Sequence, residues 1–248
     1  IIVYSSAPVT ASHLNKIPVS NAAMAYIHGR GINRNAKPHV KSNYILKLDI
    51  SDFFGSIHFG KVVNNILPKE YSLEFRTLLA NLCMYKGYLP QGSPTSPSLS
   101  NIVMKKFDDI MMEYSNANNI IYTRYADDMT FSSVDKFNPN KIINKVRYLL
   151  NKYYKMNLNE SKTVFLHNGL KQEICGIVVN DHMQVSKSYR DSIRQEMYYL
   201  NKYGVERHIY CLYYDKKIEK LLKPNEYYIR LLGKINYVLS VNPNDKHF

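Results

Sequence analysis

Three carboxylates lie where short apolar segments end, and their positions suit them for chemistry. Asp49 comes near the end of the apolar run 44–50, and Asp127-Asp128 lie between the β-rich runs 120–125 and 129–132. If these strands pack side by side, the carboxylates meet across the 78 residues (127 − 49) that separate them in sequence. Like charges held close together are costly unless cations neutralise them. Such carboxylates suit Mg²⁺, and two ions could activate an attacking hydroxyl and stabilise a leaving pyrophosphate.

Another acidic pair has a simpler interpretation. Asp108-Asp109 falls within a predicted amphipathic helix, where we expect a solvated face. The pair Asp127-Asp128 differs because apolar β-runs flank it and Tyr125-Ala126 precede it. We therefore assign the chemistry to the latter pair together with Asp49.

The elements that must position these acids alternate between strands and helices. The strand expected over 44–50 is followed by helices near 59–66 and 73–84 and by a loop over 87–97. Ser96 as N-cap and Pro97 as first helical residue predict an amphipathic helix that ends near 116–119. The pattern then predicts a hairpin with Asp127-Asp128 at its tip, followed by a helix over 138–154 and a strand over 163–166. A second hairpin is expected over 173–179 and 183–185. Helices are expected from 186 to Gly204 and from Pro224 onward.

Five segments resemble the motifs of one known family. Tyr125-Ala126-Asp127-Asp128 resembles the YxDD box of reverse transcriptases. The segments LKLDISDFF (46–54) and LPQGSPTSP (89–97) resemble motifs A and B of that family. Asn157-Leu158-Asn159 with Lys162-Thr163 resembles motif D, and 173–179 lies where the primer-grip hairpin of motif E belongs. The motifs cover about 45–185 in the order and spacing of the family.

This resemblance implies how the carboxylates would act. Asp49 and Asp127 would bind two Mg²⁺ ions directly, with the carbonyl of Ile50 helping and Asp128 completing the acidic cluster. Lys162 matches a lysine proposed to donate a proton to the pyrophosphate. From the residues alone, Lys162 could also be a simple surface cation.

The resemblance also implies a nucleotide-binding set. It comprises Phe53 and Phe54 of motif A with Gln91 and Gly92 of motif B. Phe54 matches the aromatic gate that would clash with a ribose 2′-hydroxyl, which favours dNTPs over rNTPs. Gln91 and Gly92 match the loop that lies against the incoming nucleotide and the template base. Phe54 could also serve simply as a core side chain.

A shorter element resembles one branch of the family. Asn35-Ala36-Lys37-Pro38-His39 resembles the NAxxH element of bacterial retron reverse transcriptases. The run 25–32 also resembles the sequence of those enzymes in this region. Where those enzymes carry a VTG triplet, this chain departs with Ile174-Cys175-Gly176. A lone histidine is more often structural, so His39 could also be a buried structural residue instead of an RNA contact. The weaker RNA or primer contacts expected from the resemblance are Asn35, His39, Cys175, Gly176, Lys187, Arg190 and Arg194.

The implied fold is α+β: a right-hand polymerase with a ferredoxin-like antiparallel palm sheet, partial fingers and a helical thumb. We expect partial fingers over 1–44 and a palm over 45–185. The palm would contain a fingers insertion at about 60–90 and the primer-grip hairpin at 173–185. Residues 186–248 would form the thumb.

Composition agrees with a nucleic-acid partner. The 248 residues carry 33 Lys+Arg against 20 Asp+Glu, a net charge of +13, which suits a phosphate backbone better than a membrane. No apolar run is long enough to span a bilayer, and three separated cysteines suggest a reduced, cytoplasmic protein. The 22 tyrosines could stack on bases, although biased codon usage could also explain them.

The expected function is RNA-directed DNA synthesis of retron type, in which a structured noncoding RNA is copied into single-stranded DNA. The resemblance implies dNTP substrates, an RNA–DNA hybrid, and a role in antiphage defence with an effector protein or fused effector domain. Two alternatives stay open. One is another bacterial reverse transcriptase, of abortive-infection, diversity-generating or group II intron-like type. The other is a polymerase-like scaffold that binds RNA without catalysis.

Overall fold

A four-stranded antiparallel sheet forms the centre of the computed structural model, which describes residues 14, 17–65 and 70–248. The strand order is β2-β3-β1-β4. Along the chain, helix α5 lies between β1 and β2, and α6 lies between β3 and β4. This order of elements and strands is the ferredoxin-like arrangement expected from the sequence. The strands are β1 (Tyr44–Asp49), β2 (Ile121–Tyr125), β3 (Asp128–Ser133) and β4 (Val164–His167).

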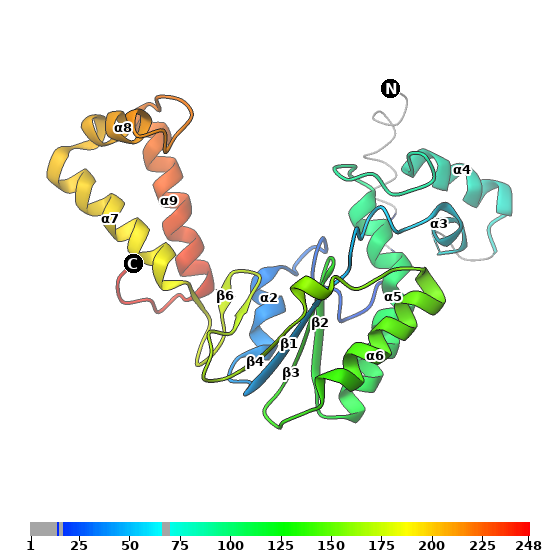
Figure 1. The fold of residues 1–248 in the computed structure, drawn as a ribbon. Helices are drawn as coiled ribbons and strands as arrows, with labels where there is room; N and C mark the ends of the chain where they lie inside the picture. Colours follow the sequence, from blue (N-terminus) through cyan, green and yellow to red (C-terminus); the bar gives the residue numbers. More distant parts are fainter. Residues whose placement is uncertain (1–13, 15–16, 66–69) are drawn as a thin grey trace.

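Two helices cover one face of this sheet (Figure 1). Helix α5 (Ser96–Ala117) buries its three- and four-residue apolar repeat, and α6 (Pro139–Leu149) continues into a π-helical turn (Leu150–Tyr154). Leu46 and Leu48 of β1 share this core. The N-cap of α5 is Thr95, so the expected cap at Ser96 is wrong by one residue. Ser96 lies inside the helix, and its hydroxyl donates to the Pro90 carbonyl at 2.7 Å.

A second core lies on the opposite face of the sheet. Ile45 belongs to it and comes directly before Leu46 in β1, so the two side chains point to opposite faces of the strand. The short helix α2 (Ile32–Ala36), followed by a 3₁₀ turn (Lys37–His39), contributes Ala36. A small antiparallel sheet of β5 (Glu173–Ile174), β6 (Ile177–Val178) and β7 (Gln184–Val185) completes this side.

The second hairpin differs from the sequence prediction. The strand expected over 173–179 is interrupted by a tight turn at Cys175-Gly176, so β5 and β6 pair with each other. Both turn residues have positive φ, 47° and 83°, as a type I′ turn requires. The third strand, β7, falls where the expected run 183–185 does.

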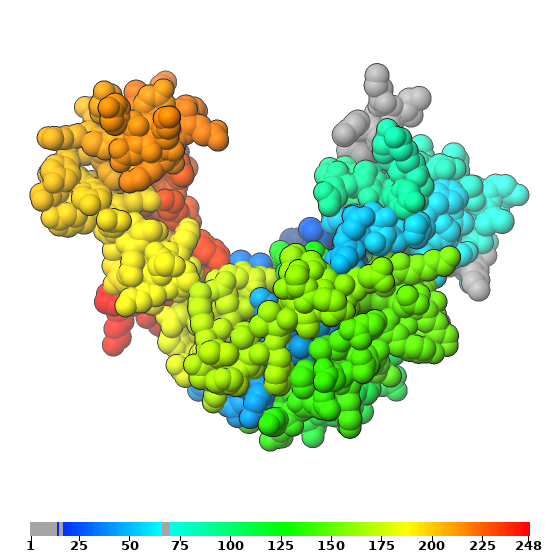
Figure 2. Space-filling model, in the orientation of Figure 1, coloured from blue at the N-terminus to red at the C-terminus, as the bar shows by residue number. Residues whose placement is uncertain are grey.

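The remaining helices form two arms on either side of the sheet (Figure 1). One arm carries α3 (Phe59–Asn65) and α4 (Leu73–Cys83), close to the helices expected there. The other carries α7 (Lys187–Tyr203), α8 (Val205–Tyr214) and α9 (Pro224–Val241). Figure 2 shows a wide hollow between the arms, with the sheet region at its base. Within the described ranges, no helix is long and apolar enough to cross a membrane.

Candidate active site

The acidic residues meet where the two inner strands of the sheet lie side by side. Asp49 ends β1 and is the cross-strand partner of Asp128, which begins β3. Asp127 occupies the two-residue turn between β2 and β3, and its carbonyl accepts a hydrogen bond from the Ile50 amide at 3.1 Å. The expectation that these strands pack side by side, with Asp49 and Asp127 78 positions apart in the chain, is therefore confirmed.

A segment from farther along the chain closes the other side of Asp49. The amide of Asn159 donates to the Asp49 carbonyl at 2.8 Å, and the Ser51 amide donates to the Asn157 carbonyl at 3.0 Å. A 3₁₀ turn (Glu160–Lys162) follows, and Lys162 Nζ lies 2.9 Å from Asp49 Oδ2. The Asp49 side chain is 5% exposed, whereas that of Lys162 is 60% exposed. The lysine thus reaches a nearly buried carboxylate from the surface.

A cavity of about 290 Å³ opens above these groups. Seven of the residues predicted to act in catalysis or nucleotide binding line it: Asp49, Ile50, Phe53, Phe54, Gln91, Asp127 and Lys162. Ser51, Asp52 and Asn159 complete the lining, and of these the sequence analysis assigned no role to Ser51 and Asp52. Asp128 and Gly92 are not part of the lining. The structure therefore brings together residues that are up to 113 positions apart in the chain.

The two phenylalanines of the predicted nucleotide-binding set have different environments. Phe53 is 4% exposed and belongs to the core beneath the cavity. Phe54 is half-buried, and its ring centroid lies 5.3 Å from that of Phe53 and 6.4 Å from that of Tyr26. Gln91 is exposed, and Gly92 has a left-handed φ of 83° in the loop before α5. Phe54 is thus the ring that stands at the boundary between core and cavity.

The carboxylates perturb one another. Burial raises the pKa of Asp127, and the charge of Asp49 adds to that effect. Burial also raises the pKa of Asp128, with further increases from Asp127 and Asp49. Asp49 raises the pKa of the Lys162 ammonium through a hydrogen bond and their charge attraction. Negative charge is therefore concentrated here beyond what one lysine offsets.

The donor chemistry at this site suits Mg²⁺, which prefers carboxylate and carbonyl oxygens. As the side chains stand, no three acidic, histidine or cysteine residues of the described ranges converge into a metal cluster. The ammonium of Lys162 supplies positive charge beside Asp49 instead. The raised pKa values of Asp127 and Asp128 show that these oxygens would gain from a nearby cation.

A buried ion pair between Arg124 and Asp108, which was not predicted from the sequence, stabilises the turn that carries Asp127. Arg124 is fully buried, and its guanidinium donates to Asp108 through Nε at 2.8 Å and Nη2 at 2.6 Å. Its Nη1 donates to the Ala126 carbonyl at 2.7 Å. Ala126 has φ 57°, a left-handed conformation that is unusual for a residue with a Cβ. Arg124 therefore fixes the strained residue that immediately precedes Asp127.

The solvated face predicted for Asp108-Asp109 is correct only for the second residue. The Asp109 side chain is 41% exposed and pairs with Lys105, whereas Asp108 is 0% exposed. A usable signal was present in the sequence, because Asp108 lies four residues after Met104 and three before Met111, both core residues. An arginine inside a β-rich run needs a buried acid, and Asp108 is at the right helical position to supply it.

The two expected RNA contacts in the NAxxH element are buried. The ring nitrogens of His39 lie 2.7 Å from Ser132 Oγ and 2.8 Å from Thr123 Oγ1, and burial lowers its pKa to about 3. Asn35 is 1% exposed, and its amide donates to the Cys175 sulfur at 3.4 Å. The RNA contacts expected of both side chains are thus not available in this structure, and the structural alternative for His39 holds.

The other expected contacts lie at the primer-grip position and at the start of α7. Cys175 is half-buried, with its pKa raised to about 11 by burial, and Gly176 is exposed at the turn. Arg190 pairs with Asp245 at 3.1 Å, and Arg194 pairs with Asp191. Lys187 is exposed. The two arginines are thus partly engaged within the protein.

Comparison with known proteins identifies the family. The model for "Reverse transcriptase (RNA-dependent DNA polymerase)" matches residues 7–201. This chain belongs to the reverse transcriptase family. The Retron Ec86 reverse transcriptase of Escherichia coli is 38% identical over 120 residues, which cover 48% of this chain and 38% of that protein. The Retron Mx65 reverse transcriptase of Myxococcus xanthus is 31% identical over 202 residues, covering 73% of this chain and 46% of that protein.

The resemblance to retron-type reverse transcriptases is thereby confirmed, and the chain spans less than half the length of these two relatives. A solved structure, apo telomerase from Candida tropicalis truncated from its C-terminal domain, matches with a TM-score of 0.51 at 12% identity. That match covers 74% of this chain and 45% of the telomerase chain. At this identity the likeness concerns the fold alone.

Proposed function

We propose that this reverse transcriptase is an RNA-directed DNA polymerase of retron type. The observation that carries the proposal is the convergence of Asp49, Asp127 and Lys162 with Phe54 and Gln91 around one cavity. This set supplies acidic oxygens, a cation and an aromatic wall where a nucleotide triphosphate and a primer end would meet. Family membership and the retron relatives support the same reaction.

In the proposed reaction, a primer hydroxyl attacks the α-phosphate of a dNTP. Asp49 and Asp127 would hold two Mg²⁺ ions, with the Ile50 carbonyl and Asp128 as further oxygen donors. Bound Mg²⁺ supplies activation of the attacking hydroxyl and stabilisation of the leaving pyrophosphate. Lys162 would then contact or protonate that pyrophosphate, a role its charge and its place on the cavity wall support.

The chain's arrangement suggests names for its parts. Residues 45–185, around the ferredoxin-like sheet, would be the palm. The arm with α3 and α4, from the insertion at about 60–90, would belong to the fingers together with the segment before residue 45. Residues 186–248 would be the thumb, and the turn at Cys175-Gly176 would lie in the primer grip.

The retron relatives support a specific set of partners. The template would be a structured noncoding RNA, and synthesis would begin from an RNA 2′-hydroxyl. The product would be single-stranded DNA joined to RNA, held as an RNA–DNA hybrid. We propose a role in antiphage defence with an effector protein or fused effector domain.

Primer extension tests the acidic cluster. Replacing Asp127→Asn and Asp128→Asn together should lower extension by on the order of a hundredfold or more, because the oxygens that stabilise the transition state lose their charge. The matched control is Asp109→Asn, since Asp109 is a partly exposed acid on α5 outside the cavity. Extension that survives the double substitution would refute the metal assignment.

Sugar selectivity tests the aromatic gate. Phe54→Val should increase rNTP incorporation relative to dNTP, because the smaller side chain leaves room for a 2′-hydroxyl. The control is Phe75→Val, which shortens a phenylalanine on α4 that is 44% exposed. The ratio of kcat/KM for the two nucleotides is the measurement, and an unchanged ratio in Phe54→Val would remove the gate role.

A further inference from the structure

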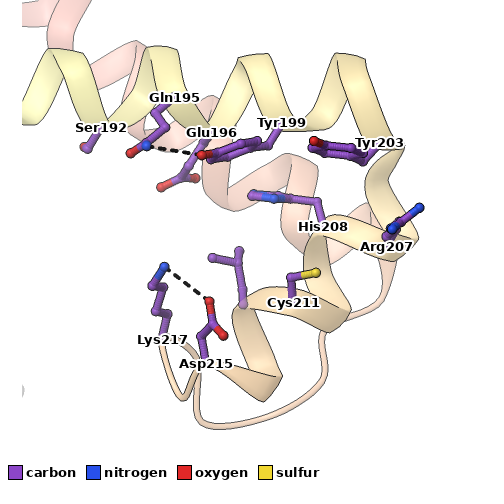
Figure 3. A pocket seen from close by; sticks show the side chains of 11 residues that line it. Ser192, Gln195, Glu196, Tyr199, Tyr203, Arg207, His208, Cys211, Asp215 and Lys217 are labelled. Carbon is purple, nitrogen blue, oxygen red and sulfur yellow. Dashed lines mark hydrogen bonds and ion pairs between the residues drawn. The ribbon is translucent and has the colours of Figure 1, made fainter.

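A second cavity, of about 490 Å³, lies between α7 and α8, on the arm away from the acids (Figure 3). Its volume lies within the range of sites that hold small organic ligands. The walls combine aromatic rings, one amide and charged groups of both signs. Nothing in the proposed polymerase reaction uses this cavity.

Aromatic rings form one side of the cavity. Tyr199 and Tyr203 lie one helical turn apart on α7, with ring centroids 6.1 Å apart and planes tilted by 25°. The His208 ring of α8 faces Tyr199 at 5.9 Å and 28°. Figure 3 shows the two tyrosine rings side by side along α7. Tyr203 is 44% exposed, so solvent reaches part of this residue beside the cations that lie over its ring.

The charges around the cavity favour an anionic ligand. Glu196 is already engaged by the Lys234 ammonium and by the Tyr227 hydroxyl, and Asp215 pairs with Lys217 at 3.4 Å. Arg207 lies 5.4 Å from the centre of the Tyr203 ring and has no ion pair with any carboxylate of the described residues. The cavity therefore presents neutralised acids and one cation beside the partly exposed Tyr203.

The same combination continues along α7 outside the cavity. Lys202 Nζ lies 5.5 Å from the Tyr198 ring centre and 5.1 Å from that of Tyr203. Tyr198 is 57% exposed. Alternating rings and cations along a helix suit a polynucleotide, whose bases stack while its phosphates contact cations. A single free nucleotide would use only the part inside the cavity.

We propose that this cavity binds one unpaired nucleotide of a single-stranded nucleic acid. Its base would stack on the exposed part of the Tyr203 ring, and its phosphate would lie by Arg207. The Gln195 amide nitrogen donates to the Tyr199 hydroxyl at 3.5 Å, which leaves the side-chain carbonyl oxygen of Gln195 for the edge of the base. This site is separate from the polymerase cavity, and its occupancy needs no nucleotide transfer.

Fluorescence of a single 2-aminopurine in a short single-stranded oligonucleotide tests the site, because stacking on an aromatic ring quenches this base. The full chain should quench the probe on binding, and RNA and DNA versions would show which sugar is preferred. Tyr203→Leu should weaken binding by about tenfold because it removes the stacking surface, and Arg207→Gln should weaken it by about tenfold because it removes the phosphate contact. The matched control, Tyr228→Leu, shortens a tyrosine on α9 that is 50% exposed and outside the cavity, and should bind normally.

Three results would overturn the proposal. One is an absence of quenching, and another is an equal loss of binding in Tyr203→Leu and in the Tyr228→Leu control. The third is competition by AMP as effective as that of the unlabelled oligonucleotide, which would indicate a site for a free nucleotide. Since binding is read without polymerisation, none of these results depends on the outcome of the extension assay.

Discussion

Arg124 is a charged residue in the interior whose three donor atoms are all engaged. Asp108 holds two of them and the Ala126 carbonyl holds the third. Asn101 adds an acceptor at 3.2 Å from Nη2 and ties the group to the Ala25 carbonyl through its own amide. One side chain thus connects α5, the β2–β3 turn and the segment before α2. Its removal affects both packing and the position of Asp127.

We expect Arg124→Met to lower the free energy of unfolding by about 3–5 kcal/mol, because it removes the only cation that pairs with the buried Asp108 among the described residues and leaves the Tyr122 hydroxyl, at 2.8 Å, as its neutral hydrogen-bond donor. Adding Asp108→Leu should restore a large part of that loss. Urea unfolding measures both variants. The control Lys105→Met breaks the exposed pair with Asp109 on the same helix and should change stability by less than about 1 kcal/mol. Equal effects of Arg124→Met and Lys105→Met would contradict this account.

His39 makes stability depend on pH with a defined sign. Its pKa is lowered to about 3 in the folded protein, so it stays neutral there, whereas the unfolded chain binds a proton near pH 6.5. The contribution of His39 to the free energy of unfolding is therefore fully present above pH 6.5 and is lost as the pH falls towards 3. Between pH 7 and pH 5 the loss should be about 2 kcal/mol.

Urea unfolding at pH 7 and pH 5 measures how the free energy of unfolding changes with pH. The His39→Gln variant provides the comparison because glutamine does not titrate. The wild-type protein should lose more stability between pH 7 and pH 5 than the variant does. The exposed histidine His58 offers a matched control through His58→Gln, which should keep the wild-type slope. A His39→Gln protein with the full wild-type slope would show that other groups cause the dependence.

At the scale of elements, substitutions at glycine test the backbone conformation of the β5–β6 turn. Gly176 has φ 83°, where a Cβ is strained, and its nearest neighbour to an added Cβ is the Tyr237 hydroxyl at 3.8 Å. Gly176→Ala should therefore lower the free energy of unfolding by about 1 kcal/mol through the backbone alone. The same change at Gly233, inside α9 with no atom within 4 Å of an added Cβ, should raise it by about 0.5–1 kcal/mol. Thermal or urea unfolding distinguishes the two signs, and a stabilising Gly176→Ala would refute the turn assignment.

Sequence periodicity predicted the elements with long regular patterns and missed those decided by local conformation. The apolar repeat of α5 and the β-runs around Asp127 determined element type because many residues agree. The turn at Cys175-Gly176 was missed because a cysteine at φ 47° is not a usual turn signal. Helix α8 was not predicted as a separate helix. Gly204 indicated where α7 ends, but it gave no sign that another helix begins directly after it.

At the scale of the whole molecule, the sequence predicted which residues lie together better than it predicted their surroundings. The motifs placed Asp49, Asp127 and Lys162 at one site, and the structure brings all three to one cavity. The burial of His39 depends on contacts with the distant residues Thr123 and Ser132, which no local pattern contains, whereas the helical spacing of Asp108 from core residues did indicate its burial. The hollow between the two arms likewise involves segments that are far apart in the chain (Figure 2).

The alternation of β1 between two cores restricts changes in chain length. Ile45 belongs to the core shared with the helical arm, whereas Leu46 and Leu48 belong to the core under α5 and α6. An insertion of one residue within β1 would exchange these faces and turn Asp49 away from its cross-strand partner Asp128. Substitutions can be accommodated along this strand, but an odd-numbered insertion or deletion would disrupt both cores and the acidic site at once.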